Sequence, residues 1–266
     1  MTESFPATAP RYVPGHQLLA GKSVLITAAA GAGIGFAAAR RCAEEGCRAL
    51  YLSDIHAKRL DQAVQTLRHE TGLEHVYGRL CNVALEHDVR ALVADAEACL
   101  EGIDVLINNA GLGGSKRIVE MDDAEWSRVI DISLTGTFRM TRAILPGMQA
   151  RGRGAIVNNA SVLGWRAQAE QAHYAAAKAG VMAFTRCAAL EAAPYGVRIN
   201  AVAPSIALHD FLKKSASADL LNQLASREAF GRAAEVWEVA NVMVFLASDY
   251  ASYMTGEVLS VSSQKA

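Results

Sequence analysis

The chain has 266 residues, 52% of them hydrophobic and 20% charged, which suits one α/β domain with a sizeable core and excludes a disordered chain. Its 26 basic and 27 acidic residues leave a formal net charge of −1, which argues against nucleic acid or a membrane as the main partner. The sequence has no apolar run of ~20 residues, no signal-peptide pattern at its start, and five cysteines without a Cys-x-x-Cys pair, so we expect a cytoplasmic protein with no metal site and no disulfide framework.

Residues 1–20 hold three of the six prolines and are predicted to form an extended N-terminal arm, either loose or packed on the domain. Residues 21–266 alternate short apolar runs with helical patterns, which is typical of βαβ units in a single α/β domain. We predict strands at 23–27, 48–53, 76–81, 104–107, 155–158, 197–202 and 257–261. Helices are predicted at 34–45, 58–70, 86–100, 123–145, 171–192 and 234–247, with Pro146-Gly147 closing the fourth. Residues 205–231 show no strand pattern and are predicted to be a mobile, helical insertion.

A glycine-rich turn joins the first predicted strand to the first predicted helix. Such a turn lets the backbone approach a pyrophosphate, which sits on the unpaired N–H groups of the helix N-terminus. A glycine-rich turn is also compatible with a mere tight connection, but its place in a βαβ unit favours a dinucleotide. The candidate cofactor-binding residues in this turn are Ala29, Gly31, Gly33, Ile34 and Gly35.

The second predicted strand ends at Asp54, 19 residues after Gly35. An acidic residue there accepts hydrogen bonds from the adenosine ribose hydroxyls and repels a 2′-phosphate, so NAD is favoured over NADP. Position 32 is alanine rather than a basic residue, which points the same way. Lys58 and Arg59 lie close by and point to NADP instead, although a solvated first helical turn accounts for them as well.

Tyr174 and Lys178 are four residues apart in a predicted helix, so they share one face, and Ser161 follows the predicted strand 155–158. A free tyrosine has a pKa of ~10, and a neighbouring ammonium favours its phenolate and lowers that pKa. We therefore predict that Tyr174 is the acid/base, that Lys178 tunes it, and that Ser161 holds the substrate oxygen during hydride transfer.

Further motifs complete the pattern: Asn108-Asn109-Ala110-Gly111, the segment 131–136, the segment 198–204 and the segment 245–249. With these, residues from about 19 to 261 resemble the short-chain dehydrogenase/reductase family. The resemblance implies a Rossmann-type, doubly wound parallel sheet flanked by helices on both faces, a nicotinamide cofactor and a homo-oligomer, either dimer or tetramer. It also makes Lys178 a ribose ligand, places Tyr174 at the cofactor, and adds cofactor contacts at Asn82, Val83, Asn109, Ala110, Gly111, Pro204, Ile206 and Ala207.

The sequence departs from the family pattern at five places, one of which is the run Ser205-Ile206-Ala207-Leu208-His209 after Pro204, where the family has a glycine and then a threonine. Ala28 stands where the first glycine belongs, which a turn tolerates if φ stays negative. Asn82 replaces an aspartate but keeps an acceptor oxygen for the adenine. Ser133 replaces a fourth catalytic residue, asparagine, and we expect its hydroxyl to bond back to a helix carbonyl and bend the helix. The end of the last strand, Val261-Ser262-Ser263-Gln264, replaces Val-Asp-Gly-Gly.

These departures resemble an actinobacterial subgroup associated with cholesterol and steroid-nucleus breakdown. We therefore expect an NAD-dependent oxidoreductase that interconverts a secondary alcohol and a ketone on an apolar, hydroxysteroid-like substrate. Residues 205–231 would form the substrate lid, and Lys213 and Lys214 could meet an acidic substrate or a coenzyme A thioester. Two alternatives stay open: an NADPH-dependent 3-oxoacyl thioester reductase, and a catalytically silent dinucleotide-binding scaffold.

The two long helices at 123–145 and 171–192 indicate an oligomer. Small residues, among them Ala172, Ala175, Ala176, Ala179 and Ala183, permit close helix approach. In the family, these helices form the main dimer interface. The alternative is that the alanines pack within one subunit.

Overall fold

The computed structural model describes residues 8–208 and 218–263. Its centre is a parallel sheet of seven strands in the order β3-β2-β1-β4-β5-β6-β9. The strands are β1 Ser23–Thr27, β2 Ala49–Asp54, β3 Val76–Leu80, β4 Val105–Asn108, β5 Gly154–Asn159, β6 Val197–Pro204 and β9 Val258–Val261. The strand order reverses between β1 and β4, which makes the sheet doubly wound, as predicted. In such sheets ligands bind in a crevice outside the carboxyl ends of the strands at this point.

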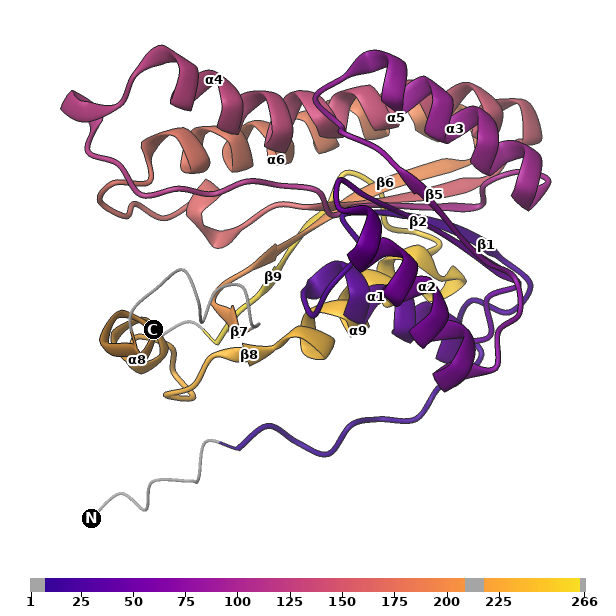
Figure 1. Cartoon of the computed structure of the whole chain (residues 1–266), viewed down its shortest axis with the longest axis horizontal. Helices are drawn as coiled ribbons and strands as arrows, with labels where there is room; N and C mark the ends of the chain where they lie inside the picture. Colours follow the sequence, from indigo (N-terminus) through magenta and orange to yellow (C-terminus); the bar gives the residue numbers. More distant parts are fainter. Residues whose placement is uncertain (1–7, 209–217, 264–266) are drawn as a thin grey trace.

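Helices cover both faces of the sheet (Figure 1). One face carries α1 Ile34–Glu44, α2 Ala57–Thr71 and α9 Val236–Ala247, and the other carries α3 Glu86–Leu100, α4 Asp123–Ile130, α5 Gly136–Arg151 and α6 Ala172–Ala192. Short turns of helix lie at η1 Ile118–Glu120, η3 Val162–Gly164, η4 Ala193–Tyr195 and η5 Asp249–Ala251. Because both faces are covered, all five residues of β1 are buried, Val24 and Ile26 in one core layer and Leu25 in the other.

The predicted helix at 123–145 differs from the structure in two ways. A π-helical turn, η2 Asp131–Thr135, separates α4 from α5, and α5 continues through Pro146 to Arg151. The prediction that Pro146-Gly147 closes this helix is therefore wrong. The helix ends at Gly152, whose left-handed φ of 67° caps it, and the buried face formed by Met140, Ile144 and Met148 outweighs the proline's missing N–H.

The insertion at 205–231 contains a short strand that the sequence does not predict. β7 Ala207–Leu208 pairs in parallel with β8 Ala234–Glu235, and α8 Ala218–Ser226 lies between them in the chain. Strands of two residues are too short to leave a period-2 pattern, which is why this one was missed. The predicted lid residues Phe211, Leu212, Lys213 and Lys214 lie outside the described residues.

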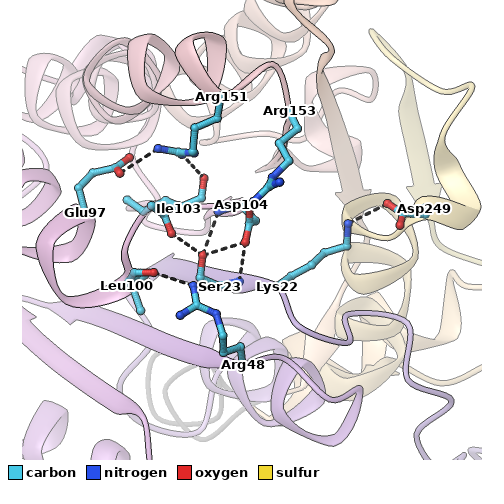
Figure 2. Close-up of polar contacts among 11 residues, drawn as sticks. Lys22, Ser23, Arg48, Glu97, Leu100, Ile103, Asp104, Arg151, Arg153 and Asp249 are labelled. Carbon is cyan, nitrogen blue, oxygen red and sulfur yellow. Dashed lines mark hydrogen bonds and ion pairs between the residues drawn. The ribbon is translucent and has the colours of Figure 1, made fainter.

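A polar cluster ties the elements together at the amino ends of the strands, away from the crevice (Figure 2). The Asp104 carboxylate accepts hydrogen bonds from the backbone N–H of Ser23 (3.0 Å) and the side chain of Arg153 (3.2 Å). Arg151 bonds Glu97 (3.0 Å) and the carbonyl of Ile103 (2.7 Å). These contacts join β1, β4, β5, α3 and α5 at the amino ends of the strands. The candidate functional residues lie at the opposite, carboxyl ends.

The N-terminal arm packs on the domain from Tyr12 onward. The fully buried carboxylate of Glu45 accepts the backbone N–H groups of His16 (2.7 Å) and Leu18 (3.0 Å) and pairs with buried Arg41. The Arg41 guanidinium also bonds the arm carbonyls of Val13 and Pro14. Of the two alternatives, the described part of the arm therefore takes the packed one.

Candidate active site

Ser161, Tyr174 and Lys178 meet at the carboxyl edge of the sheet, beside the strands that the crevice separates. Ser161 follows β5 and caps η3, where its Oγ accepts the N–H of Leu163 (3.2 Å). Tyr174 and Lys178 project from the first two turns of α6, and Lys178 Nζ lies 5.6 Å from the centre of the Tyr174 ring. The same Nζ donates to the backbone carbonyl of Asn159 at 2.6 Å, which ties α6 to the end of β5.

Burial dominates the electrostatics of these side chains. It raises the pKa of Tyr174, and a hydrogen bond with the Ser161 side chain partly offsets that rise. Burial also lowers the pKa of Lys178 to about 8. For Tyr174, the loss of solvent around the phenol is the larger of the two effects on its pKa.

Ser133 lies in the π-helical turn η2, fully buried, and its hydroxyl reaches out of the helix. Its Oγ accepts the N–H of Leu112 (2.9 Å) and donates to the carbonyl of the same residue (3.0 Å). The predicted back-bond from Ser133 to a carbonyl of its own helix is therefore wrong. Thr137 makes that kind of bond instead, to the Ser133 carbonyl at 3.1 Å. Ser133 thus fixes the loop that follows β4.

Ser133 and Lys178 both lie close to this loop, at Gly111. A methyl group on Gly111 would lie 3.2 Å from Lys178 Nζ and 3.7 Å from Ser133 Oγ. Two residues further on, a methyl group on Gly113 would lie 3.7 Å from the Tyr174 ring. The structure therefore gathers Ser133, Ser161, Tyr174 and Lys178, the four candidate catalytic residues, around the loop after β4.

The glycine-rich turn runs from Ala28 to Gly35 between β1 and α1. Ala28 takes a left-handed φ of 50°, so the condition of a negative φ is not met there. Gly35 must lack a side chain, because a Cβ would lie 2.3 Å from the Ala28 carbonyl oxygen. At Gly31 and Gly33 a Cβ would meet nothing within 4 Å, and no described side chain caps the α1 N-terminus after Gly33. Ala29 is fully buried and Ile34 opens α1.

Asp54 ends β2 and is 7% exposed. Its carboxylate accepts the N–H of Ala30 in the glycine-rich turn (3.2 Å) and the N–H of His56 (3.0 Å), and the Arg59 guanidinium lies 4.0 Å away. Burial raises the pKa of Asp54, and the Ala30 hydrogen bond and the Arg59 charge work against that rise. Asp54 therefore borders the glycine-rich turn, with a basic side chain beside it.

The remaining predicted cofactor residues line the same edge. Thr27 Oγ1 accepts the N–H groups of Asn109 and Ala110, each at 3.0 Å, which locks the ends of β1 and β4 together. After β3, the side-chain oxygen of Asn82 accepts the Ala84 N–H (3.0 Å) and keeps a second lone pair. The nearby Val83 is buried.

Three predicted residues lie at the end of β6 and just after it. Pro204 and Ala207 are buried, and the Ile206 carbonyl accepts the Ala234 N–H (2.9 Å), so this stretch is joined to β8 and the insertion. Three further residues bond the candidate site residues and were not predicted from the sequence. Leu112 and Asn159 accept through their backbone carbonyls, from Ser133 and Lys178, and Thr27 Oγ1 accepts the N–H groups of Asn109 and Ala110. Side-chain patterns carry no signal for backbone acceptors.

An open surface cavity of about 510 Å³ lies at the start of α6, the helix that carries Tyr174. Its walls come from the loop after β4 and from the segment before α6, and they consist of Lys116, Arg117, Ile118, Val119, Gln168, Ala169, Glu170 and Ala172. Ile118 and Val119 are largely exposed, at 72% and 78%. The Glu170 carbonyl accepts the Lys116 N–H (3.0 Å), which joins the two walls. A mainly apolar ligand of moderate size fits this lining.

The residues at the crevice fit a dinucleotide. The open backbone at Gly31 and Gly33 and the uncapped start of α1 suit a pyrophosphate, and Asp54 stands where an adenosine ribose would lie. Among residues 8–208 and 218–263, no cluster of three or more acidic, histidine or cysteine side chains is arranged to hold a metal ion. No helix in the same ranges is long and apolar enough to cross a membrane.

Comparisons with known proteins agree with this geometry. The family model described as Enoyl-(Acyl carrier protein) reductase matches residues 28–263. A Mycobacterium tuberculosis protein, (5R,7aS)-5-hydroxy-7a-methyl-1-oxo-2,3,5,6,7,7a-hexahydro-1H-indene-carboxyl-CoA reductase, is 58% identical over 97% of this chain and 98% of its own length. Cis-4-hydroxycyclohexanecarboxylate dehydrogenase of Sinomonas cyclohexanicum is 41% identical over 90% and 94%. The crystal structure of a short chain dehydrogenase from Mycobacterium smegmatis is similar with a TM-score of 0.87 and 51% identity, covering 98% of this chain and all of that one.

Proposed function

The chain belongs to the short-chain dehydrogenase/reductase family, whose members act on CH–OH groups with NAD(P), and on that premise we propose that it interconverts a ring alcohol and a ketone with NAD. The observation that carries the proposal is the meeting of Ser161, Tyr174 and Lys178 beside a crevice that fits a dinucleotide. When bound, the cofactor supplies or accepts the hydride.

In the proposed mechanism, Tyr174 Oη moves the proton. In the direction of ketone reduction it donates its proton to the substrate oxygen, and in the direction of alcohol oxidation it accepts that proton. Ser161 donates a hydrogen bond to the same oxygen and keeps it within reach of the phenol. Lys178 stabilises the phenolate and holds the ribose hydroxyls, and Ser133 holds the loop that presses against the tyrosine.

The substrate we propose is a carbocycle that carries both a hydroxyl or keto group and a carboxyl group, free or as a coenzyme A thioester. The names of the two relatives above share this feature. The apolar wall formed by Ile118, Val119 and Ala172 suits a ring, in agreement with a steroid-degradation intermediate. The carboxyl or thioester end would extend toward solvent.

For the cofactor, NAD is favoured because the Asp54 carboxylate would repel a 2′-phosphate. The position of Arg59 favours NADP, because a basic side chain near Asp54 could pair with a 2′-phosphate. Its guanidinium lies 4.0 Å from the Asp54 carboxylate, and its side chain is 47% exposed. The choice of cofactor separates the two proposals, because the ring-alcohol activity uses NAD and the alternative 3-oxoacyl thioester reductase uses NADPH.

The test is a fluorescence titration with NADH and with NADPH, followed by assays of cis-4-hydroxycyclohexanecarboxylate, its coenzyme A thioester and a 3-oxoacyl thioester. We expect tighter binding of NADH and turnover of a ring substrate. Preference for NADPH together with turnover of the 3-oxoacyl thioester would favour the alternative reductase. Cofactor binding without turnover across the panel would favour the silent scaffold.

A further inference from the structure

The far end of the insertion, just after α8, contains a buried carboxylate. Glu228 is 5% exposed. Its Oε2 accepts a hydrogen bond from Ser263 Oγ (3.3 Å), and its Oε1 lies 3.7 Å from Arg166 Nη1. Removing a carboxylate from water is costly unless charges and donors compensate it, so these two partners account for its position.

Backbone N–H groups of the residues after Glu228 bond Ser263, which follows the last strand of the sheet, β9. The Ala229 N–H donates to the Ser263 carbonyl (2.7 Å), and the Phe230 N–H approaches Ser263 Oγ at 3.4 Å. At the other end of the insertion, the Ser205 N–H donates to the Val261 carbonyl (3.1 Å). Both ends of the insertion are therefore fixed to β9 and the residues after it. Ser263 stands where the family pattern has glycine, and its hydroxyl makes two of these contacts.

Arg166 extends the connection to the catalytic side. It lies five residues after Ser161, and its backbone N–H donates to the carbonyl of Val162 (2.8 Å) in η3, the turn that Ser161 caps. The Arg166 side chain is 38% exposed, so it stands at the surface between η3 and the insertion. One carboxylate thus joins the insertion, the end of the chain and the segment carrying Ser161.

We propose that Glu228 is a positioning residue that holds the stretch after α8 against the segment carrying Ser161. Its side chain acts through Arg166 and Ser263. The part of the proposal that concerns substrate rests on the proposed function. Because Tyr174, Lys178 and the dinucleotide crevice are untouched, loss of the Glu228 charge weakens substrate binding and leaves cofactor binding unchanged.

Two variants test this. Glu228→Gln keeps the size and the acceptor for Ser263 but removes the charge facing Arg166, and Ser263→Ala removes the hydroxyl alone. Ser262→Ala is the matched control, since Ser262 Oγ bonds Ser260 on an exposed surface. For Glu228→Gln we expect KM for the coenzyme A thioester of cis-4-hydroxycyclohexanecarboxylate to rise about tenfold, kcat to change less than about twofold and the NADH Kd to stay at the wild-type value.

Hydrogen–deuterium exchange gives a readout that needs no substrate. Residues 218–231 should exchange faster in Glu228→Gln and Ser263→Ala, and at the wild-type rate in Ser262→Ala. In a double-mutant cycle, adding Arg166→Gln to Glu228→Gln should cause little further change, because both remove one interaction. Wild-type exchange in both variants overturns the proposal. If the wild-type enzyme turns over none of the ring substrates, the proposed function fails and exchange alone decides the role of Glu228.

Discussion

Lys178, which we propose acts in the chemistry, lowers the stability of the fold. Its pKa of about 8 lies below the ordinary lysine value, so the folded protein disfavours the protonated form. Below pH 8 the charge is present and destabilises the fold by about 3 kcal/mol. As the pH rises from about 8 to about 10.5, the unfolded chain binds the proton more than the folded chain does, so this destabilisation is relieved.

Lys178→Met should therefore stabilise the protein while abolishing activity. We expect the free energy of unfolding at pH 7 to rise by about 1–3 kcal/mol, less than the full electrostatic term because the bond to Asn159 is lost. The gain should shrink toward pH 10. Urea denaturation at both pH values measures it, and a variant less stable than wild type at pH 7 would contradict the burial argument.

Ala28 carries strain that a glycine would relieve. A φ of 50° destabilises an alanine by about 1 kcal/mol through steric contacts, which a glycine avoids. A glycine also has more conformational freedom in the unfolded chain, and this offsets part of the gain in stability. Ala28→Gly should raise the free energy of unfolding by about 0.5 kcal/mol. Ala30→Gly is the control, since Ala30 has no positive φ, and it should lower stability. Equal losses in both variants would refute strain at Ala28.

At the scale of elements, the arm and α1 form one unit through Glu45. Replacing this fully buried carboxylate leaves Arg41 and two arm N–H groups without their partner. Glu45→Ala should therefore lower the free energy of unfolding by about 3–5 kcal/mol. Glu70→Ala removes a surface pair with Arg40, both 41% exposed, and should change it by less than about 1 kcal/mol. Similar small losses in the two variants would show that the arm is not anchored there.

The elements also show what a single sequence can predict. The central strands leave continuous apolar runs because helices cover both faces, so their positions follow from the pattern. The pattern does not predict the π-helical turn at 131–135 or the passage of α5 through Pro146, because packing against the core decides both. The site residues share this limit: side-chain spacing predicts Tyr174 and Lys178, whereas the bonds of Ser133 to Leu112 depend on where a distant loop folds.

At the scale of the whole molecule, the helices α4 to α6 expose apolar side chains that one chain does not cover. Phe138 is 38% exposed, Trp126 40% and Leu190 77%. We propose that a second copy covers them. Light scattering at micromolar concentration should give at least twice the 28.3 kDa of one chain, and a mass of 28.3 kDa would contradict this.

The central claim is that Tyr174 moves the proton in an NAD-dependent interconversion of a ring alcohol and a ketone. Its most direct test compares wild type with Tyr174→Phe, measuring the rate of NADH formation from the coenzyme A thioester of cis-4-hydroxycyclohexanecarboxylate and, separately, the NADH Kd. The account predicts a loss of about 10²–10⁴-fold in kcat with an unchanged Kd, because the phenylalanine keeps the packing and lacks only the hydroxyl. Full activity in Tyr174→Phe would contradict it.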